Sequence, residues 1–109
     1  MSDSTTISPE NEVITLINVF TVEPSNQDKL VQMLRNDTLE VMQYFPGWIS
    51  ASVHAGLDGK TVVNYAQRKT IDDLEAMTKD AVAEERIINM RKLAMSNPHL
   101  YRVAFVHHT

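Results

Sequence analysis

Polar side chains of distinct chemistry end a segment that otherwise has the pattern of a buried strand, Val62-Val63-Asn64-Tyr65-Ala66-Gln67-Arg68. Because side chains alternate along a strand, Asn64, Ala66 and Arg68 project to the same face. An unpaired amide buried under helices costs ~1–3 kcal/mol, so Asn64 requires a partner from protein, water or a ligand. The small Ala66 side chain favours a cavity. The structural alternative is that Asn64 bonds to neighbouring backbone and Arg68 reaches solvent.

A second amide is expected in the same layer. Leu16, Asn18 and Phe20 share one face of an apolar segment, so Asn18 is buried if its two neighbours are core residues. Two amides that converge on one apolar pocket indicate a ligand site. Trp48 and Tyr65 are further candidates to line this pocket. The alternative for these two aromatic residues is that they fill the core or a subunit interface.

The histidines carry a weaker signal. His54, His99, His107 and His108 show no pair with the spacing of a helical metal motif, so we expect no metal site. His54 is a candidate proton acceptor because an unperturbed imidazole titrates near neutrality. A purely structural role for this strand residue is the alternative.

Composition limits the remaining classes of function. A chain of 109 residues predicts one domain, and 43% hydrophobic with 22% charged residues is typical of a globular protein. The net charge of −4 provides no basic surface for nucleic acid or an anionic membrane. The chain has no cysteine, which is compatible with a reducing cytoplasm.

The ends of the chain add two expectations. The sequence starts without the basic and apolar regions of a signal peptide, and it contains no apolar run long enough to span a membrane. We therefore expect an untargeted, soluble, cytoplasmic protein. Residues 1–11 are mostly polar and predict a flexible tail, and residues 12–109 predict the folded domain.

Hydrophobic periodicity predicts the element order βαββαβ. The expected elements are a strand over 13–22, a helix over 26–44, strands over 48–55 and 61–68, a helical region from Thr70 to about Asn97 that breaks near Asp80, and a strand over 100–107. This order in one short domain predicts an α+β, ferredoxin-like fold with both helical regions on one face of an antiparallel sheet. A second subunit is the simplest cover for the other face, so we expect a homodimer.

Four short motifs occur in and around the predicted hairpin, namely Pro46-Gly47-Trp48-Ile49-Ser50-Ala51, His54-Ala55, Asp58-Gly59 and Val62-Val63-Asn64-Tyr65-Ala66-Gln67. Together they resemble the antibiotic biosynthesis monooxygenase family, and in particular its cofactor-free oxygenases of aromatic polyketide anthrones and phenols. The resemblance spans about residues 13–106. It implies ferredoxin-like protomers whose sheets form a dimeric α+β barrel, with a substrate pocket between sheet and helices.

The resemblance also implies roles for particular residues. Asn64 matches a family asparagine proposed to stabilise an oxyanion or reduced oxygen. The anthrone oxygenases have a tryptophan directly after this motif, where the present chain has Arg68, and their helical arginine falls near Ile88. Asn18 also matches the haem-degrading branch of the superfamily, but the haem-ligating histidine of that branch has no counterpart in the second helical region.

The implied function is a cofactor-independent monooxygenase that uses O2 to oxidise an aromatic phenol, anthrone or hydroquinone to a quinone. Asn64, Arg68 and His54 are then the candidate catalytic residues, and Asn18, Trp48, Ala66 and Tyr65 the candidate substrate-binding residues. One alternative is a non-catalytic dimer that binds a small ligand or acts as a stress-related accessory protein. A cofactor-independent isomerase or cyclase is a third reading.

Overall fold

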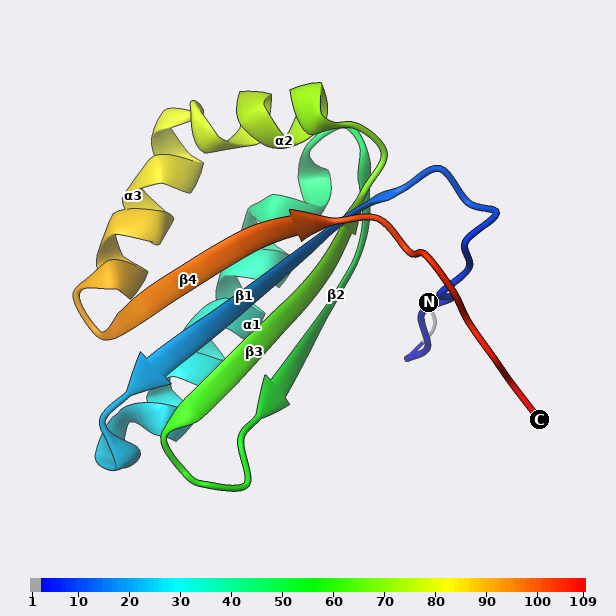
Figure 1. The fold of residues 1–109 in the computed structure, drawn as a ribbon. Coiled ribbons are helices and arrows are strands. Elements are labelled where there is room, and N and C mark those ends of the chain that lie inside the picture. The colour runs from blue at the N-terminus through cyan, green and yellow to red at the C-terminus, as the bar shows by residue number, and fades with distance from the viewer. Residues whose placement is uncertain (1–2) are drawn as a thin grey trace.

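Four antiparallel strands form one sheet in the computed structural model, which describes residues 3–109. The strands are β1 (Ile14–Val22), β2 (Trp48–Ala55), β3 (Thr61–Arg68) and β4 (Ala94–Tyr101), in the spatial order β2-β3-β1-β4. The helices α1 (Gln27–Glu40), α2 (Ile71–Thr78) and α3 (Ala81–Arg91) cover one face of this sheet (Figure 1). The predicted α+β, ferredoxin-like fold is confirmed.

Helix boundaries follow local capping chemistry. The helical region after β3 divides where predicted, because the Asp80 side chain accepts hydrogen bonds from the backbone N–H groups of Val82 and Ala83, each at 3.1 Å, and starts a new helix. Thr70 caps α2 in the same way, through the Asp73 N–H at 3.0 Å. The first helix is shorter than predicted. It ends at Glu40, and a separate 3₁₀ turn, η2 (Met42–Tyr44), follows; another, η1 (Pro24–Asn26), precedes the helix.

Two groups of buried apolar side chains hold the helices on the sheet. One contains Phe20, Leu30, Leu34, Val62 and Met90. The other contains Met42, Leu74, Met77 and Ala83. Both groups lie on the helix-facing side of the sheet. Because they are separate groups that hold different helices, a cavity can form in the layer between the sheet and the helices.

The last strand was placed wrongly from the sequence. The segment predicted to be helix up to Asn97 contains the first half of β4, and residues 102–107 of the predicted strand are neither helix nor strand. The error arises because the strand lies at a sheet edge, where Pro98 is tolerated although it has no N–H to donate. Next to it, the Asn97 N–H donates to the Asn18 side chain at 3.0 Å, which attaches β4 to β1.

The segment before β1 contacts the sheet face opposite the helices. Residues 3–13 contain neither helix nor strand, and this segment and the one after β4 leave the same end of the sheet (Figure 1). The Gln67 amide donates to the Thr6 carbonyl at 2.8 Å and accepts from the Thr5 and Ser50 hydroxyls at 2.9 and 2.8 Å. The flexible tail over 1–11 and the domain over 12–109 stay predictions, and residues 1–2 lie outside the described residues.

Candidate active site

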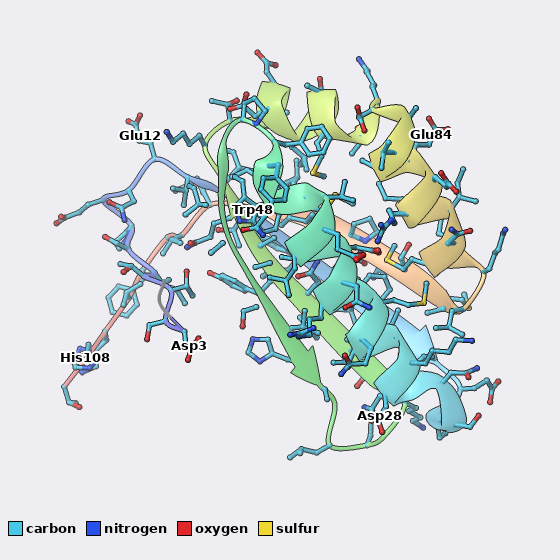
Figure 2. The ribbon with its side chains drawn as sticks, turned by 180° about the vertical axis from the view of Figure 1, so that it is seen from behind. Asp3, Glu12, Asp28, Trp48, Glu84 and His108 are labelled. Carbon is cyan, nitrogen blue, oxygen red and sulfur yellow. The ribbon has the colours of Figure 1, made fainter. Side chains whose placement is uncertain are left out.

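A cavity of about 450 Å³ lies between the helix-facing side of the sheet and the helices. Its volume is in the range of small-molecule sites. Figure 2 shows the helix side of the molecule, with α1 in front of the sheet and Trp48 at the start of β2. The walls are mainly apolar and include Leu16, Phe20, Leu34, Met42, Met77 and Met90. The cavity therefore suits a flat apolar ligand.

Strand register brings four of the predicted site residues to this cavity. Asn18 and Asn64 are direct partners between β1 and β3, and Arg68 is the partner of Trp48 between β3 and β2. All four side chains belong to the helix-facing side of the sheet and line the cavity. The polar groups thus come from neighbouring strands on a rigid floor.

Asn64 is left without an internal partner for its oxygen. Its Oδ1 is buried, and it makes no hydrogen bond within residues 3–109; the Thr15 hydroxyl is the other atom in this state. Asn18 differs, because its Oδ1 accepts the Asn97 N–H. A buried acceptor without a partner costs ~1–3 kcal/mol, so a ligand that bonds to Asn64 recovers energy that folding leaves unrealised.

Arg68 is a buried cation that makes no ion pair with any of the described residues. Its side chain is 4% exposed, and its Cζ lies 4.1 Å from the centre of the Trp48 ring. Nη1 donates to the Gln67 carbonyl at 3.4 Å, and Nη2 approaches the Met77 sulfur at 3.6 Å. Burial lowers the pKa of Arg68 to about 10, which still leaves the guanidinium charged at neutral pH. The alternative that Arg68 reaches solvent is wrong.

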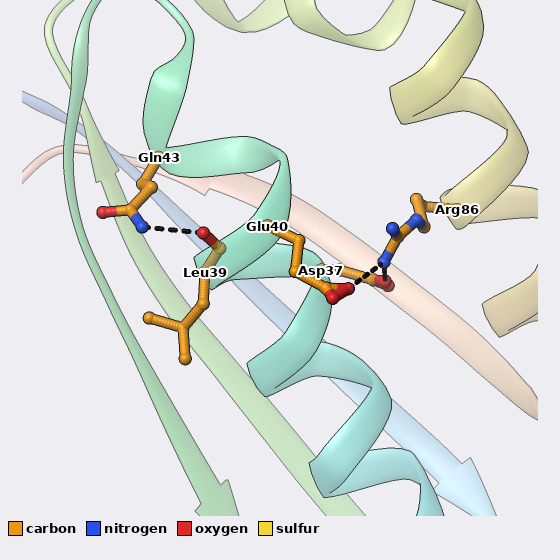
Figure 3. A network of polar contacts seen from close by, with 5 residues as sticks. All are labelled: Asp37, Leu39, Glu40, Gln43 and Arg86. Atoms are coloured by element: carbon orange, nitrogen blue, oxygen red, sulfur yellow. Dashed lines mark hydrogen bonds and ion pairs between the residues drawn. The ribbon is translucent and has the colours of Figure 1, made fainter.

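A second charged group at the cavity is already paired. Asp37 on α1 lines the cavity, and its Oδ1 accepts a bond from Arg86 Nη1 of α3 at 3.0 Å (Figure 3). The same Nη1 lies 3.2 Å from Glu40 Oε1. Burial raises the pKa of Asp37, and the bond to Arg86 opposes this change. The pair joins α1 to α3 and is separate from Arg68.

Three predicted site residues are not brought to the cavity. His54 pairs with Val63 on the opposite face of the sheet, where it is exposed and its Nε2 lies 2.8 Å from the Ser52 hydroxyl. Tyr65 lies on that face too, because strand alternation opposes it to Asn64. Ala66 is buried on the correct face but does not line the cavity. Within one chain, His54 therefore cannot serve as the proton acceptor for a ligand in this cavity.

Several polar residues that line the cavity were not among the predicted site residues, namely Asp37, Thr38, Thr78, Arg91 and Ser96. Asp37 follows Leu30 and Leu34 at helical spacing, so its position on the buried stripe of α1 was a signal that it faces inward.

His99 also borders the cavity from β4, but it pairs with Ile17 on the face opposite the helices. Its ring contacts Tyr101 and lies 3.0 Å from the Asn97 side-chain oxygen on that face. His99 falls between the predicted helical region, which ended at about Asn97, and the predicted strand over 100–107, so the sequence assigned it to no strand face.

The described residues offer no cluster for a metal. No group of three or more His, Asp or Glu side chains in residues 3–109 is arranged to hold an ion. No helix in that range is long and apolar enough to cross a membrane. The predicted cytoplasmic location remains a prediction.

Comparison with known proteins places the chain in a family. No family model matches it. It is 37% identical over 93 residues to the tetracenomycin-F1 monooxygenase of Streptomyces glaucescens, covering 85% of this chain and 83% of the relative. The chain belongs to the antibiotic biosynthesis monooxygenase family. The resemblance found in the sequence motifs is confirmed, and the protein is a monooxygenase of this family.

Solved structures of similar proteins support the same assignment. The ActVA-Orf6 monooxygenase of Streptomyces coelicolor, in complex with nanaomycin D, is 26% identical with a TM-score of 0.72, covering 93% of this chain and 96% of that one. SnoaB of Streptomyces nogalater, a cofactor-independent oxygenase, has a TM-score of 0.70 at 17% identity, covering 87% and 96%. At this lower identity, the likeness to SnoaB shows the fold.

The uncompensated charge of Arg68 predicts a gain in stability when it is removed. We expect Arg68→Met to raise the free energy of unfolding of the ligand-free monooxygenase by about 1 kcal/mol, because methionine nearly keeps the length of the side chain without a buried charge. The lost stacking on Trp48 offsets part of the gain. Chemical denaturation followed by circular dichroism measures the difference.

The gain should also depend on pH. The pKa of Arg68 in the folded chain, about 10, is below its unfolded value, so folding releases the proton at high pH and the wild-type protein gains stability as the pH rises through about 10. The advantage of Arg68→Met should narrow over that window. Arg35→Met, at an exposed position of α1, is the control and should show neither effect. A variant at Arg68 that is less stable than wild type at neutral pH would contradict this account.

Proposed function

We propose that this protein is a cofactor-independent monooxygenase that oxidises an aromatic phenol, anthrone or hydroquinone to a quinone with O2. The observation that carries the proposal is the buried Asn64 amide, whose oxygen has no partner among the described residues, on the floor of an apolar cavity. The cofactor-independent oxygenase SnoaB and the nanaomycin D complex of the ActVA-Orf6 monooxygenase support it. Proteins of the same fold thus include a cofactor-independent oxygenase and a monooxygenase that binds nanaomycin D.

The substrate must supply the electrons in such a reaction. Triplet O2 reacts poorly with closed-shell organic molecules, so the substrate becomes reactive only when loss of a proton makes it electron-rich. For an anthrone, the methylene carbon gives up both hydrogens and gains one oxygen atom as the quinone carbonyl. The second oxygen atom leaves as water with those two hydrogens, so atoms and electrons balance without a reductant.

Asn64 is suited to stabilise the deprotonated substrate. An amide offers two N–H donors and an oxygen acceptor, so rotation of the side chain lets it accept from a hydroxyl or donate to the oxyanion that follows. In an apolar cavity from which the ligand excludes water, such a bond is stronger than in water. Arg68 adds positive charge to the same cavity, which favours the binding of an ionised substrate. Asn18 and Trp48 help to bind and orient the ring system.

Oxygen uptake by metal-free protein tests the function. A panel of anthrones and hydroquinones is mixed with the enzyme, and O2 consumption and quinone formation are measured together. We expect one quinone for each O2 with an anthrone. Stoichiometric binding without uptake would favour a non-catalytic binder or accessory protein, and conversion without uptake would favour an isomerase or cyclase.

Loss of the Asn64 amide should slow turnover strongly. Removing one donor to an oxyanion lowers kcat by on the order of 10²–10³, so Asn64→Ala should approach this loss with an anthrone substrate. Asn36→Ala is the control, because Asn36 is an exposed amide on α1 outside the cavity. Steady-state kinetics and a circular dichroism spectrum of each variant are compared. Full turnover by Asn64→Ala would remove this residue from the mechanism.

A homodimer is part of the proposal. The sheet face opposite the helices carries the half-buried Ile17 and Val63 and the exposed Val19, Met95 and Tyr101, an apolar surface that a second copy would cover. Sedimentation should detect a dimer at micromolar concentration. Val19→Lys should weaken it, because the charge would be buried at the middle of the interface.

A matched control separates this effect from a general loss of surface hydrophobicity. Leu39→Lys places the same charge at an equally exposed apolar position on α1, away from the open sheet face, and should leave the dimer intact. A wild-type protein that sediments as a monomer at micromolar concentration would exclude the dimer.

A further inference from the structure

Arg68 imposes a requirement on the ligand that the oxidation itself does not explain. We propose that the substrate carries an ionised carboxylate on its aromatic frame and that this carboxylate pairs with Arg68. The inference rests on the proposed function and narrows its substrate class from neutral phenols and anthrones to polycyclic aromatic acids. It makes Arg68 a binding residue in the ground state.

The first step is the missing counter-charge. No carboxylate in the described part of the chain lies within ion-pair distance of Arg68. Asp37 is the acidic residue that lines the cavity, and its charge is already balanced by Arg86. Burial is the cause that lowers the pKa of Arg68, without an opposing carboxylate to raise it. Of the two arginines that line the cavity, Arg91 is exposed to solvent and Arg68 is buried, so Arg68 is the buried positive charge that an anionic ligand would balance.

The second step is the orientation of the guanidinium. Its plane is supported by the Trp48 ring at 4.1 Å, and its contacts are a long bond to a carbonyl and an approach to the Met77 thioether, which is a weak acceptor. A guanidinium offers five N–H donors, and a carboxylate accepts two of them in parallel. Arg68 is thus held in place on one side and has strong donors left for a planar anion.

The third step is the separation of the two polar groups. Asn64 and Arg68 are four residues apart on the same face of β3, so their Cα atoms are about 13 Å apart along the strand. The Arg68 head group stays at its own end because it stacks on Trp48, its direct partner on β2. A single oxygen atom of a rigid ligand can therefore contact either Asn64 or Arg68, but not both. A polycyclic acid can place its reacting centre near Asn64 and its carboxylate near Arg68.

The fourth step is the ionisation state of the ligand in water. A phenol has a pKa near ~10 and enters the cavity neutral, whereas a carboxylic acid with a pKa near ~4 enters as an anion. The carboxylate therefore balances Arg68 from the moment of binding. The Asn64 amide remains available for the oxyanion that forms during the reaction.

A matched pair of ligands tests the inference without turnover. Anthraquinone carboxylate and anthraquinone carboxamide have nearly the same shape and differ in charge, and neither consumes O2. Titration calorimetry gives each Kd, and quenching of Trp48, the single tryptophan of the chain, reports binding beside Arg68. We expect the wild-type protein to bind the carboxylate at least about tenfold more tightly than the carboxamide.

Variants identify the residue responsible. Arg68→Gln should abolish the preference, because it should weaken the binding of the carboxylate ligand and leave the binding of the carboxamide unchanged. Arg68→Met provides a second neutral variant if the first does not fold. Arg35→Gln makes the same change in net charge at an exposed position of α1 and should keep the preference. Equal binding of both ligands by wild type, or a preference that survives both Arg68 variants, would overturn the proposal.

Kinetics separate this inference from the function on which it rests. With an anthrone carboxylate, Arg68→Gln should raise KM far more than it lowers kcat. If kcat falls instead and KM is unchanged, Arg68 acts on the reacting oxygen and the carboxylate proposal is overturned. If wild type consumes no O2 but keeps its preference for the carboxylate, the oxygenase proposal fails and the binding site stands.

Discussion

The constraint on which the site depends is a buried guanidinium in a layer that is otherwise apolar. Arg68 ends β3 on the helix-facing side of the sheet, where it stacks on Trp48 and makes no ion pair within residues 3–109. Taking such a charge out of water is unfavourable, and the cation–π contact returns part of that energy. A protein without a ligand for this position would be more stable with an apolar residue there. Arg68 therefore lowers the stability of the ligand-free protein, and its proposed role is to recognise the ligand.

The arrangement of the helices keeps this charge unbalanced. Asp37 lines the same cavity as Arg68, but it is bound to Arg86 across the gap between α1 and α3. The break at Asp80 matters here, because it gives α3 a direction of its own and lets Arg86 meet α1 (Figure 3). The ion pair between Asp37 and Arg86 thus joins α1 to α3. Because it occupies Asp37, the charge of Arg68 on the floor of the cavity stays unbalanced by the described residues.

Local patterns predicted most of the sheet and the floor of the site. Strand alternation is a property of the backbone, so it set Asn64 and Arg68 on one face of their strand and grouped Asn18 with Leu16 and Phe20. It left open whether Arg68 reaches solvent. It also opposed Tyr65 to Asn64, and the same rule excludes His54 from the cavity. The last strand was predicted too late in the chain, because Ile88 and Met95 fit a helical period and an edge strand can contain Pro98. The ion pair between Asp37 and Arg86 depends on how α1 and α3 are packed against each other, which cannot be predicted from the sequence of either helix alone.

The residue after the Asn-Tyr-Ala-Gln motif can differ between proteins of this fold, and with it the recognition of the ligand, while the strands beneath the cavity keep their register. The resemblance to anthrone oxygenases sets a tryptophan at this position, where Arg68 stands here. Trp48 lies directly across the sheet and offers its ring to the guanidinium, so this end of the cavity is both aromatic and charged. The strand register and the Asn64 amide do not depend on this exchange. The chemistry assigned to Asn64 and the recognition assigned to Arg68 are therefore separable, which is why binding and turnover respond to different residues in this reading of the site.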